Sequence, residues 1–349
     1  MPVNFYISNS KLKENIKLTF LSALVLFLGM HSMLNYLVSI KTTKSSFVTN
    51  IHSKTKHMQL NSSSDIDIIF VGNSRTFFHI STKVFKKNSL NIYNYGVSDR
   101  TIYNYTYMVE QAIKQHPKTI VLSLKLSDFF EQSDYLNRVA LSDISAMIKS
   151  HQKFSLVRKA MNDYIHFFYS LIDYSDVINI KVQSLYNKFE PKIVNTFKET
   201  KRVISNDSVE KVESDCQVFD IKYPKNMRTE KCTNGDGILF GNTIKLQDIK
   251  KKISSFNEEY VDLLNYIINK ITKENIQPIV VFEPLFHTTF DYNGTLINEI
   301  KSDVIDLTSL NIEDIMWVDN NHLNGEGRVF YSHILAERLK EKIDENSSF

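Results

Sequence analysis

Two short segments, far apart in the chain, hold residue types that together can move an acyl group. The first reads GNSR at 72–75 and the second reads DNNHLNGEG at 319–327. A serine hydroxyl becomes a nucleophile when a base takes its proton, and a histidine held by a carboxylate is such a base. Asp319 and His322 are close enough on one turn for the carboxylate to lie beside the imidazole. The pattern therefore favours Ser74 as nucleophile, His322 as base and Asp319 as its orienting partner.

These residues need elements that bring them together. The apolar, β-branched run at 66–71 predicts a buried strand, and Ser74 follows it on a turn before a helix. The second segment follows a short strand expected at 315–318 and precedes a helix expected at 325–342, with Asn324 as a good N-cap. Both segments then lie at the carboxyl edge of one sheet, where open α/β folds bind ligands.

The rest of the pattern completes an α/β fold. Further strands are expected at 90–95, 119–126 and 278–282, and helices at 101–115 and 256–275. Strands alternating with helices of this length predict a parallel five-stranded sheet with helices on both faces. Between the third and fourth strands lies an insertion, 131–250, whose first half has helical, aromatic spacing and which we expect to be mostly helical.

The N-terminal region predicts a membrane anchor. No charged side chain occurs from Leu18 to Ile40, and a helix over this stretch is about 34 Å long, enough to cross a hydrocarbon core. A cleaved signal peptide is the rival interpretation, but no small-residue cleavage site follows. We thus expect a tail at 1–17, an anchor at 18–40, a polar stalk at 41–64, and an α/β domain at 65–130 and 251–349. Lysines flank the span on both sides, so charge does not decide its orientation.

Composition excludes some partners. The 349 residues carry 42 basic and 39 acidic side chains, a balance that argues against binding to nucleic acid. The two cysteines, Cys216 and Cys232, lie in one polar segment without the spacing of a zinc site. They predict a disulfide if the domain is exported, and two unpaired thiols if it is not. We expect no metal and no cofactor.

The paired motifs resemble those of the SGNH (GDSL-like) hydrolases, which carry Gly-x-Ser near the start and Asp-x-x-His near the end. The resemblance covers 65–128 and 277–340 and implies a flavodoxin-like sheet with Ser74, His322 and Asp319 as the triad. It also implies that the backbone amides of Ser74 and Gly96 form part of an oxyanion hole. The family usually supplies an asparagine side chain after the third strand, but this chain has Ser127 in that region. We expect Ser127, or a backbone amide nearby, to substitute for the asparagine.

An anchored chain with a large insertion is similar to SGNH proteins that act outside the membrane. Those proteins O-acetylate polysaccharides or D-alanylate wall polymers beside a multi-spanning acyltransferase. The resemblance implies acyl transfer to an envelope glycan through an acyl-serine. Two other functions stay open: an esterase acting on carbohydrate or lipid esters, and an inactive binding or assembly subunit. Asn73, Arg75, Glu283 and His287 are candidate pocket residues, although a salt bridge would equally explain Arg75 and a plain loop would explain Glu283 and His287.

Overall fold

The computed structural model describes residues 9–41, 51–61, 66–130, 136, 138–172, 216–219, 228–232, 235–240, 249–252, 257–291 and 295–347. The chain divides into two compact units. One comprises 1–42 with 167–192, and the other comprises 43–166 with 193–349.

The first unit is dominated by a long helix, α1 (Asn9–Lys41). Its stretch Glu14–Met33 is long and apolar enough to cross a membrane. Large apolar side chains along this stretch are exposed, among them Phe20 and Leu26. Exposure of so much apolar surface is costly in water and is relieved in a bilayer. A single helix of this kind near the N-terminus is compatible with the expected single-pass anchor.

The second unit contains the expected parallel sheet. Its five strands are β1 (Ile68–Gly72), β2 (Ile92–Gly96), β3 (Thr119–Leu124), β8 (Gln277–Phe282) and β10 (Asp303–Asp306). They lie in the order β2-β1-β3-β8-β10, and every neighbouring pair is parallel. Numbered along the chain, this order is 2-1-3-4-5. The prediction of an α/β fold with a five-stranded parallel sheet is therefore confirmed.

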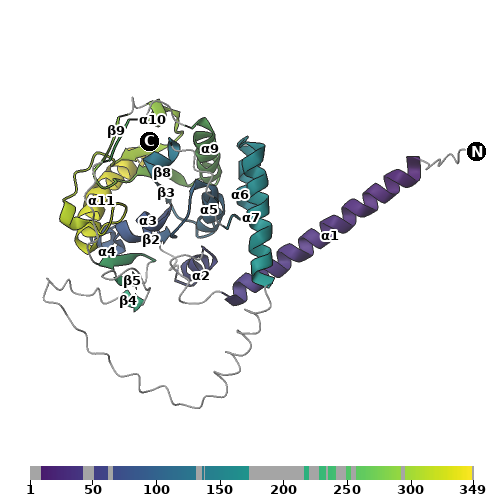
Figure 1. Ribbon diagram of the computed structural model, residues 1–349. Helices are drawn as coiled ribbons and strands as arrows, with labels where there is room; N and C mark the ends of the chain where they lie inside the picture. The colour runs from purple at the N-terminus through teal and green to yellow at the C-terminus, as the bar shows by residue number, and fades with distance from the viewer. Residues whose placement is uncertain are drawn as a thin grey trace, which may run out of the picture. The chain divides into compact units, whose positions relative to one another are not determined.

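Helices cover both faces of this sheet (Figure 1). One face carries α3 (Ser74–His79), α4 (Thr82–Lys87) and α11 (Gly325–Ser347), and α11 contacts both of the shorter helices. The other carries α5 (Tyr105–Ile113) and α9 (Glu258–Thr272), with α6 (Leu141–Lys149) packed on both. Short 3-10 turns lie at η2 (Ile102–Asn104), η3 (Leu126–Phe129) and η4 (Asp314–Met316). Among the helices that the structure adds to the prediction are α4 and the short α10 (Thr295–Glu299).

Alternating strand residues build the core under α11. Side chains two apart on a strand point to the same face. The face of Phe70, Val121 and Ile279 is buried together with side chains of α11. These helix residues repeat every three or four positions: Tyr331, Leu335, Ala336 and Leu339. This packing fixes the helix that directly follows the Asp-His segment.

The prediction of a fifth strand at 315–318 is wrong. This segment contains the end of η4 and a single antiparallel bridge between Trp317 and Leu323. The fifth strand is instead β10, at one edge of the sheet, whose sequence DVID alternates polar and apolar residues. An edge strand needs only one apolar face, so its short polar pattern did not stand out as a strand. Trp317 and Val318 are buried because they close a loop, and burial made them look like strand residues.

Part of the predicted stalk is folded. Residues 51–61 form the helix α2 (Ile51–Asn61), which contacts β2 and α5. Ile51 and Met58 are buried, and so is Lys54, which donates a hydrogen bond to the carbonyl of Gly235. The polar composition suggested a linker, but its few apolar residues lie one helical repeat apart and pack on the domain.

Within the described residues, the insertion is helical in its first half, as expected. It begins with α6 and α7 (Phe154–Ile172), where Tyr164 is buried and the side chains of Phe168 and Tyr169 lie outside the described residues. Its second half contains an antiparallel sheet of β4 (Cys216–Phe219), β5 (Arg228–Cys232) and β6 (Gly237–Phe240). A further strand, β7 (Ile249–Lys252), pairs in parallel with β9 (Thr288–Asp291).

Candidate active site

Ser74 stands at the carboxyl end of β1, as the first residue of α3. Asn73 caps this helix, because its side-chain oxygen accepts a hydrogen bond from the Arg75 amide at 2.9 Å. Two glycines make room for the turn. A Cβ at Gly72 would lie 1.8 Å from Thr76 Oγ1, and a Cβ at Gly96 would lie 2.3 Å from the Phe77 backbone nitrogen. The helix can therefore start directly against the ends of β1 and β2.

The Asp-His segment forms a closed loop between η4 and α11. The Val318 amide donates to the His322 carbonyl at 2.8 Å, and the Asn324 amide donates to the Met316 carbonyl at 2.9 Å. Asn324 also caps α11, since its side-chain oxygen accepts from the Gly327 amide at 3.0 Å. These bonds make the loop a rigid support for His322.

The structure brings Ser74, His322 and Asp319 into one hydrogen-bonded chain. Ser74 Oγ lies 2.9 Å from His322 Nε2. His322 Nδ1 lies 3.0 Å from Asp319 Oδ1 and 2.9 Å from Oδ2. All of these distances are within the reach required for proton transfer.

Asp319 is held as a carboxylate. Burial opposes its charged form, but the hydrogen bond and charge of His322 outweigh burial and lower the pKa of Asp319. The backbone amides of Asn321 and His322 also donate to Oδ1, at 2.7 and 2.8 Å. Because a carboxylate only accepts, His322 must carry its proton on Nδ1. Its Nε2 is then free to accept the proton of Ser74.

Aromatic and apolar side chains pack behind this chain. The ring of Phe78 meets the His322 ring edge to face, with centroids 5.7 Å apart. Phe77, Phe78, Val318 and Leu239 form one buried cluster. Leu239 belongs to β6, so the insertion contributes to the packing beneath the candidate site.

A buried polar cluster adjoins the site, and the sequence did not predict it. Glu283 follows β8 and is 1% exposed, so it does not line an open pocket as expected. It accepts hydrogen bonds from Thr76 Oγ1 and Ser123 Oγ, and Arg75 Nε lies 3.5 Å from its Oε2. His79 Nδ1 lies 3.2 Å from the same oxygen. Arg75 therefore forms a buried ion pair, the alternative that we had left open for it.

The remaining predicted pocket residue, His287, is directed elsewhere. Its Nε2 lies 2.6 Å from Asp314 Oδ1 at the exposed surface, and its ring stacks on Phe286. A polar residue after a strand can make a structural contact or bind a ligand, and the sequence does not distinguish these two roles.

The structure shows the surroundings of two of the expected oxyanion donors, Gly96 and Ser127. The Gly96 amide donates to Asn94 Oδ1 at 2.9 Å, so this N–H is occupied within the protein. Ser127 lies in η3 and is buried, and its Oγ has no hydrogen-bond partner among the described residues. Gly96 is required here by the close approach of α3, which accounts for a glycine at this position without an oxyanion role.

The two cysteines are direct partners in the register of β4 and β5. Their side chains lie outside the described residues, so the disulfide stays a prediction. Opposed residues of antiparallel strands have Cα atoms about 4.5–5.5 Å apart, which is within the range that a disulfide spans.

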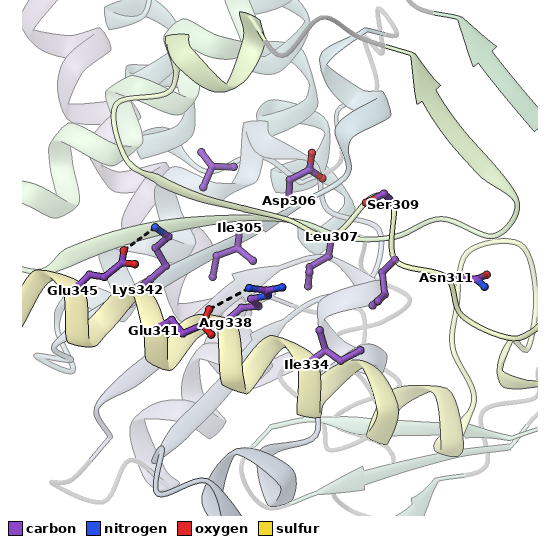
Figure 2. Close-up of a pocket in the computed structure, with 12 residues that line it drawn as sticks. Ile305, Asp306, Leu307, Ser309, Asn311, Ile334, Arg338, Glu341, Lys342 and Glu345 are labelled. Atoms are coloured by element: carbon purple, nitrogen blue, oxygen red, sulfur yellow. Dashed lines mark hydrogen bonds and ion pairs between the residues drawn. The ribbon is translucent and has the colours of Figure 1, made fainter.

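Two surface cavities of the described residues are lined by residues other than the candidate triad. One of about 550 Å³ lies along the edge strand β10 and the second half of α11. Figure 2 shows its lining, with the ion pairs Arg338–Glu341 and Lys342–Glu345 on the helix side. Another of similar volume lies between α6 and α9, with Lys149 and Asp262 in its lining. Neither is lined by a residue of the candidate triad.

Within the described ranges, no group of three His, Cys, Asp or Glu side chains is arranged to hold a metal ion. Comparison of the chain with known protein families, with curated proteins and with solved structures finds no match.

Proposed function

We propose that this chain is a membrane-anchored serine acyltransferase of the SGNH type. The observation that carries the proposal is the hydrogen-bonded chain from Ser74 Oγ through His322 to Asp319. It lies at the carboxyl edge of a parallel sheet, where α/β enzymes of many kinds bind their substrates. The strand order 2-1-3-4-5 is the flavodoxin-like order, which further supports this family.

The proposed reaction has two half-reactions. Ser74 Oγ attacks the carbonyl carbon of an acyl donor while His322 Nε2 takes the hydroxyl proton. The donor's leaving group departs with that proton, and the acyl group remains on Ser74 as an ester. A hydroxyl of the acceptor then loses its proton to His322 and attacks the ester, which releases Ser74 and returns the proton to it.

We place this activity at the outer face of a membrane, with an envelope glycan as acceptor and acetyl as the acyl group. The apolar helix α1 supports an anchored protein. The opposed cysteines of β4 and β5 support an oxidising compartment. A multi-spanning membrane acyltransferase is the proposed source of the acyl group.

Hydrolysis is the second candidate function. The His322 side chain is 20% exposed, and Ser74 is half-buried, so water can reach the acyl-serine. With water as acceptor the same site is an esterase. An inactive binding subunit is the third candidate, and the occupied Gly96 amide is the observation in its favour.

A fluorophosphonate probe tests the nucleophile. The full-length protein in detergent micelles should be labelled, Ser74→Ala should not, and Ser309→Ala, a serine beside the cavity along β10, should label normally. Labelling of Ser74→Ala at the wild-type rate would refute the proposal. An unlabelled wild type would favour the inactive subunit.

A labelled acyl ester then separates transferase from esterase. With an oligosaccharide present, a transferase should pass label to sugar faster than to water, and the excess should grow with sugar concentration. Release to water alone at every sugar concentration would support the esterase.

A further inference from the structure

A second histidine lies directly behind His322. His79 is the last residue of α3, the helix that begins with Ser74, and its side chain is fully buried. Its ring centroid lies 6.4 Å from that of His322 and 6.2 Å from that of Trp317. It therefore stands between the helix of the nucleophile and the loop of the base.

Each ring nitrogen of His79 faces one defined group. Nε2 accepts a hydrogen bond from the backbone amide of Leu323 at 3.2 Å. A neutral imidazole has one donor and one acceptor, so its proton lies on Nδ1, which is 3.2 Å from Glu283 Oε2. Burial lowers the pKa of His79, although Glu283 acts in the opposite direction. The ring therefore stays neutral and keeps its acceptor free for Leu323.

Glu283 is fixed by groups from several elements. Thr76 of α3 and Ser123 of β3 donate to its Oε1, and Arg75 lies on its Oε2 side. Glu283 itself follows β8, and its amide donates to the Leu124 carbonyl at 3.1 Å. The orientation of the His79 ring is thus tied to the sheet and not to a mobile side chain.

The Leu323 amide belongs to the peptide that leaves His322. Leu323 also forms the bridge with Trp317 that closes the loop. We infer that His79 is a positioning residue, which accepts the Leu323 N–H and thereby holds His322 at hydrogen-bonding distance from Ser74. The effect of this hydrogen bond on activity rests on the proposed function, whereas the hydrogen bond itself does not.

Two substitutions separate the two contacts of the ring. In His79→Gln the amide reaches about as far as Nε2, so an oxygen can still accept from Leu323 while the contact with Glu283 is lost. In His79→Asn the amide reaches about as far as Nδ1, so the contact with Glu283 can persist while the Leu323 N–H loses its acceptor. Both variants introduce a carboxamide, but only His79→Gln keeps an acceptor for the Leu323 N–H.

The test measures fluorophosphonate inactivation of the folded full-length protein in micelles. Displacement of a catalytic group by about 1 Å can cost about 100-fold in rate. We expect His79→Asn to lower the maximal inactivation rate by that order while the half-saturating probe concentration stays unchanged. His79→Gln should stay within about fivefold of the wild type. Equal rates for His79→Asn and wild type, or a greater loss in His79→Gln, would overturn the inference.

Hydrogen exchange at the Leu323 amide gives a readout that needs no activity. It should be slow in the wild type and His79→Gln, and at least about tenfold faster in His79→Asn. Unchanged exchange in His79→Asn overturns the inference even if every protein is labelled. Faster exchange in His79→Asn, together with an unlabelled wild type, supports the bond and refutes the proposed acyl transfer instead.

Discussion

Replacing Asp319 by asparagine should invert the histidine tautomer. Asp319 Oδ1 accepts from the backbone amides of Asn321 and His322, at 2.7 and 2.8 Å. An asparagine should therefore keep its oxygen at this position, because an NH₂ group there would face two N–H donors. Its NH₂ then occupies the place of Oδ2, 2.9 Å from His322 Nδ1.

At that distance two N–H groups cannot face each other. The Oδ1 position is also 3.0 Å from Nδ1, but it already accepts two backbone amides. The His322 proton should thus move to Nε2, which then donates to Ser74 and cannot act as a base. The same replacement in a serine protease triad lowers turnover about 10,000-fold. That factor corresponds to about 5 kcal/mol of lost transition-state stabilisation.

The measurement is the second-order rate of fluorophosphonate labelling for Asp319→Asn. Asp314→Asn is the matched control, because Asp314 precedes the same loop and contacts a histidine, His287, at the surface. We expect the control to label within about threefold of the wild type, as exposed ion pairs contribute little. If Asp319→Asn labels within tenfold of the wild type while its melting temperature is unchanged, the tautomer argument is refuted.

Three further predictions concern stability. Glu283 and Asp319 both have lowered pKa values, so the unfolded chain binds more protons, and the free energy of unfolding should fall as pH drops below their ordinary values of 4.5 and 3.8. Urea titrations should show a weaker pH slope in Asp319→Asn; an equal slope would contradict this. Asp236 pairs with Arg328 in the interior, so Asp236→Ala should lose about 3–5 kcal/mol. The double variant with Arg328→Met should recover part of this loss in the same titrations, whereas additive losses would contradict the pairing. Gly96→Ala should lower the free energy of unfolding by about 3 kcal/mol, since its Cβ meets backbone, and an unchanged melting temperature would count against this placement of α3.

The sequence predicted the elements with strong apolar periodicity. The strands at 66–71, 90–95, 119–126 and 278–282 correspond to β1, β2, β3 and β8 with shifts of one or two residues. All four are buried over most of their length, so apolar side chains predominate on both of their faces. The edge strand β10 has no such run, and the loop around Trp317 imitates one. The missed strand β10 and the wrongly predicted strand at 315–318 have the same cause. Apolar patterns report which residues are buried, and they do not report which residues pair in a sheet.

The candidate triad was predictable because its residues lie in short local motifs at strand ends. His79 and Glu283 were harder to assign, because their partners lie far away in the chain. Two signals were nevertheless present. His79 interrupts an apolar run, Phe77-Phe78-His79-Ile80, and Glu283 directly follows a buried strand. A polar side chain at such a place needs a buried partner, and in the structure His79 Nδ1 lies 3.2 Å from Glu283 Oε2.

In the proposed reaction, the oxyanion donors limit turnover more than the triad does. The triad is already within hydrogen-bonding distance without substrate, but the Gly96 amide is occupied by Asn94. Removing one oxyanion donor typically costs about 100- to 1,000-fold in turnover. Asn94 itself is held by the Thr76 carbonyl, which accepts from its Nδ2 at 2.7 Å, so releasing Gly96 requires α3 and β2 to shift together. A chain that labels with fluorophosphonate yet turns over esters slowly would therefore indicate an assembled triad with an incomplete oxyanion hole.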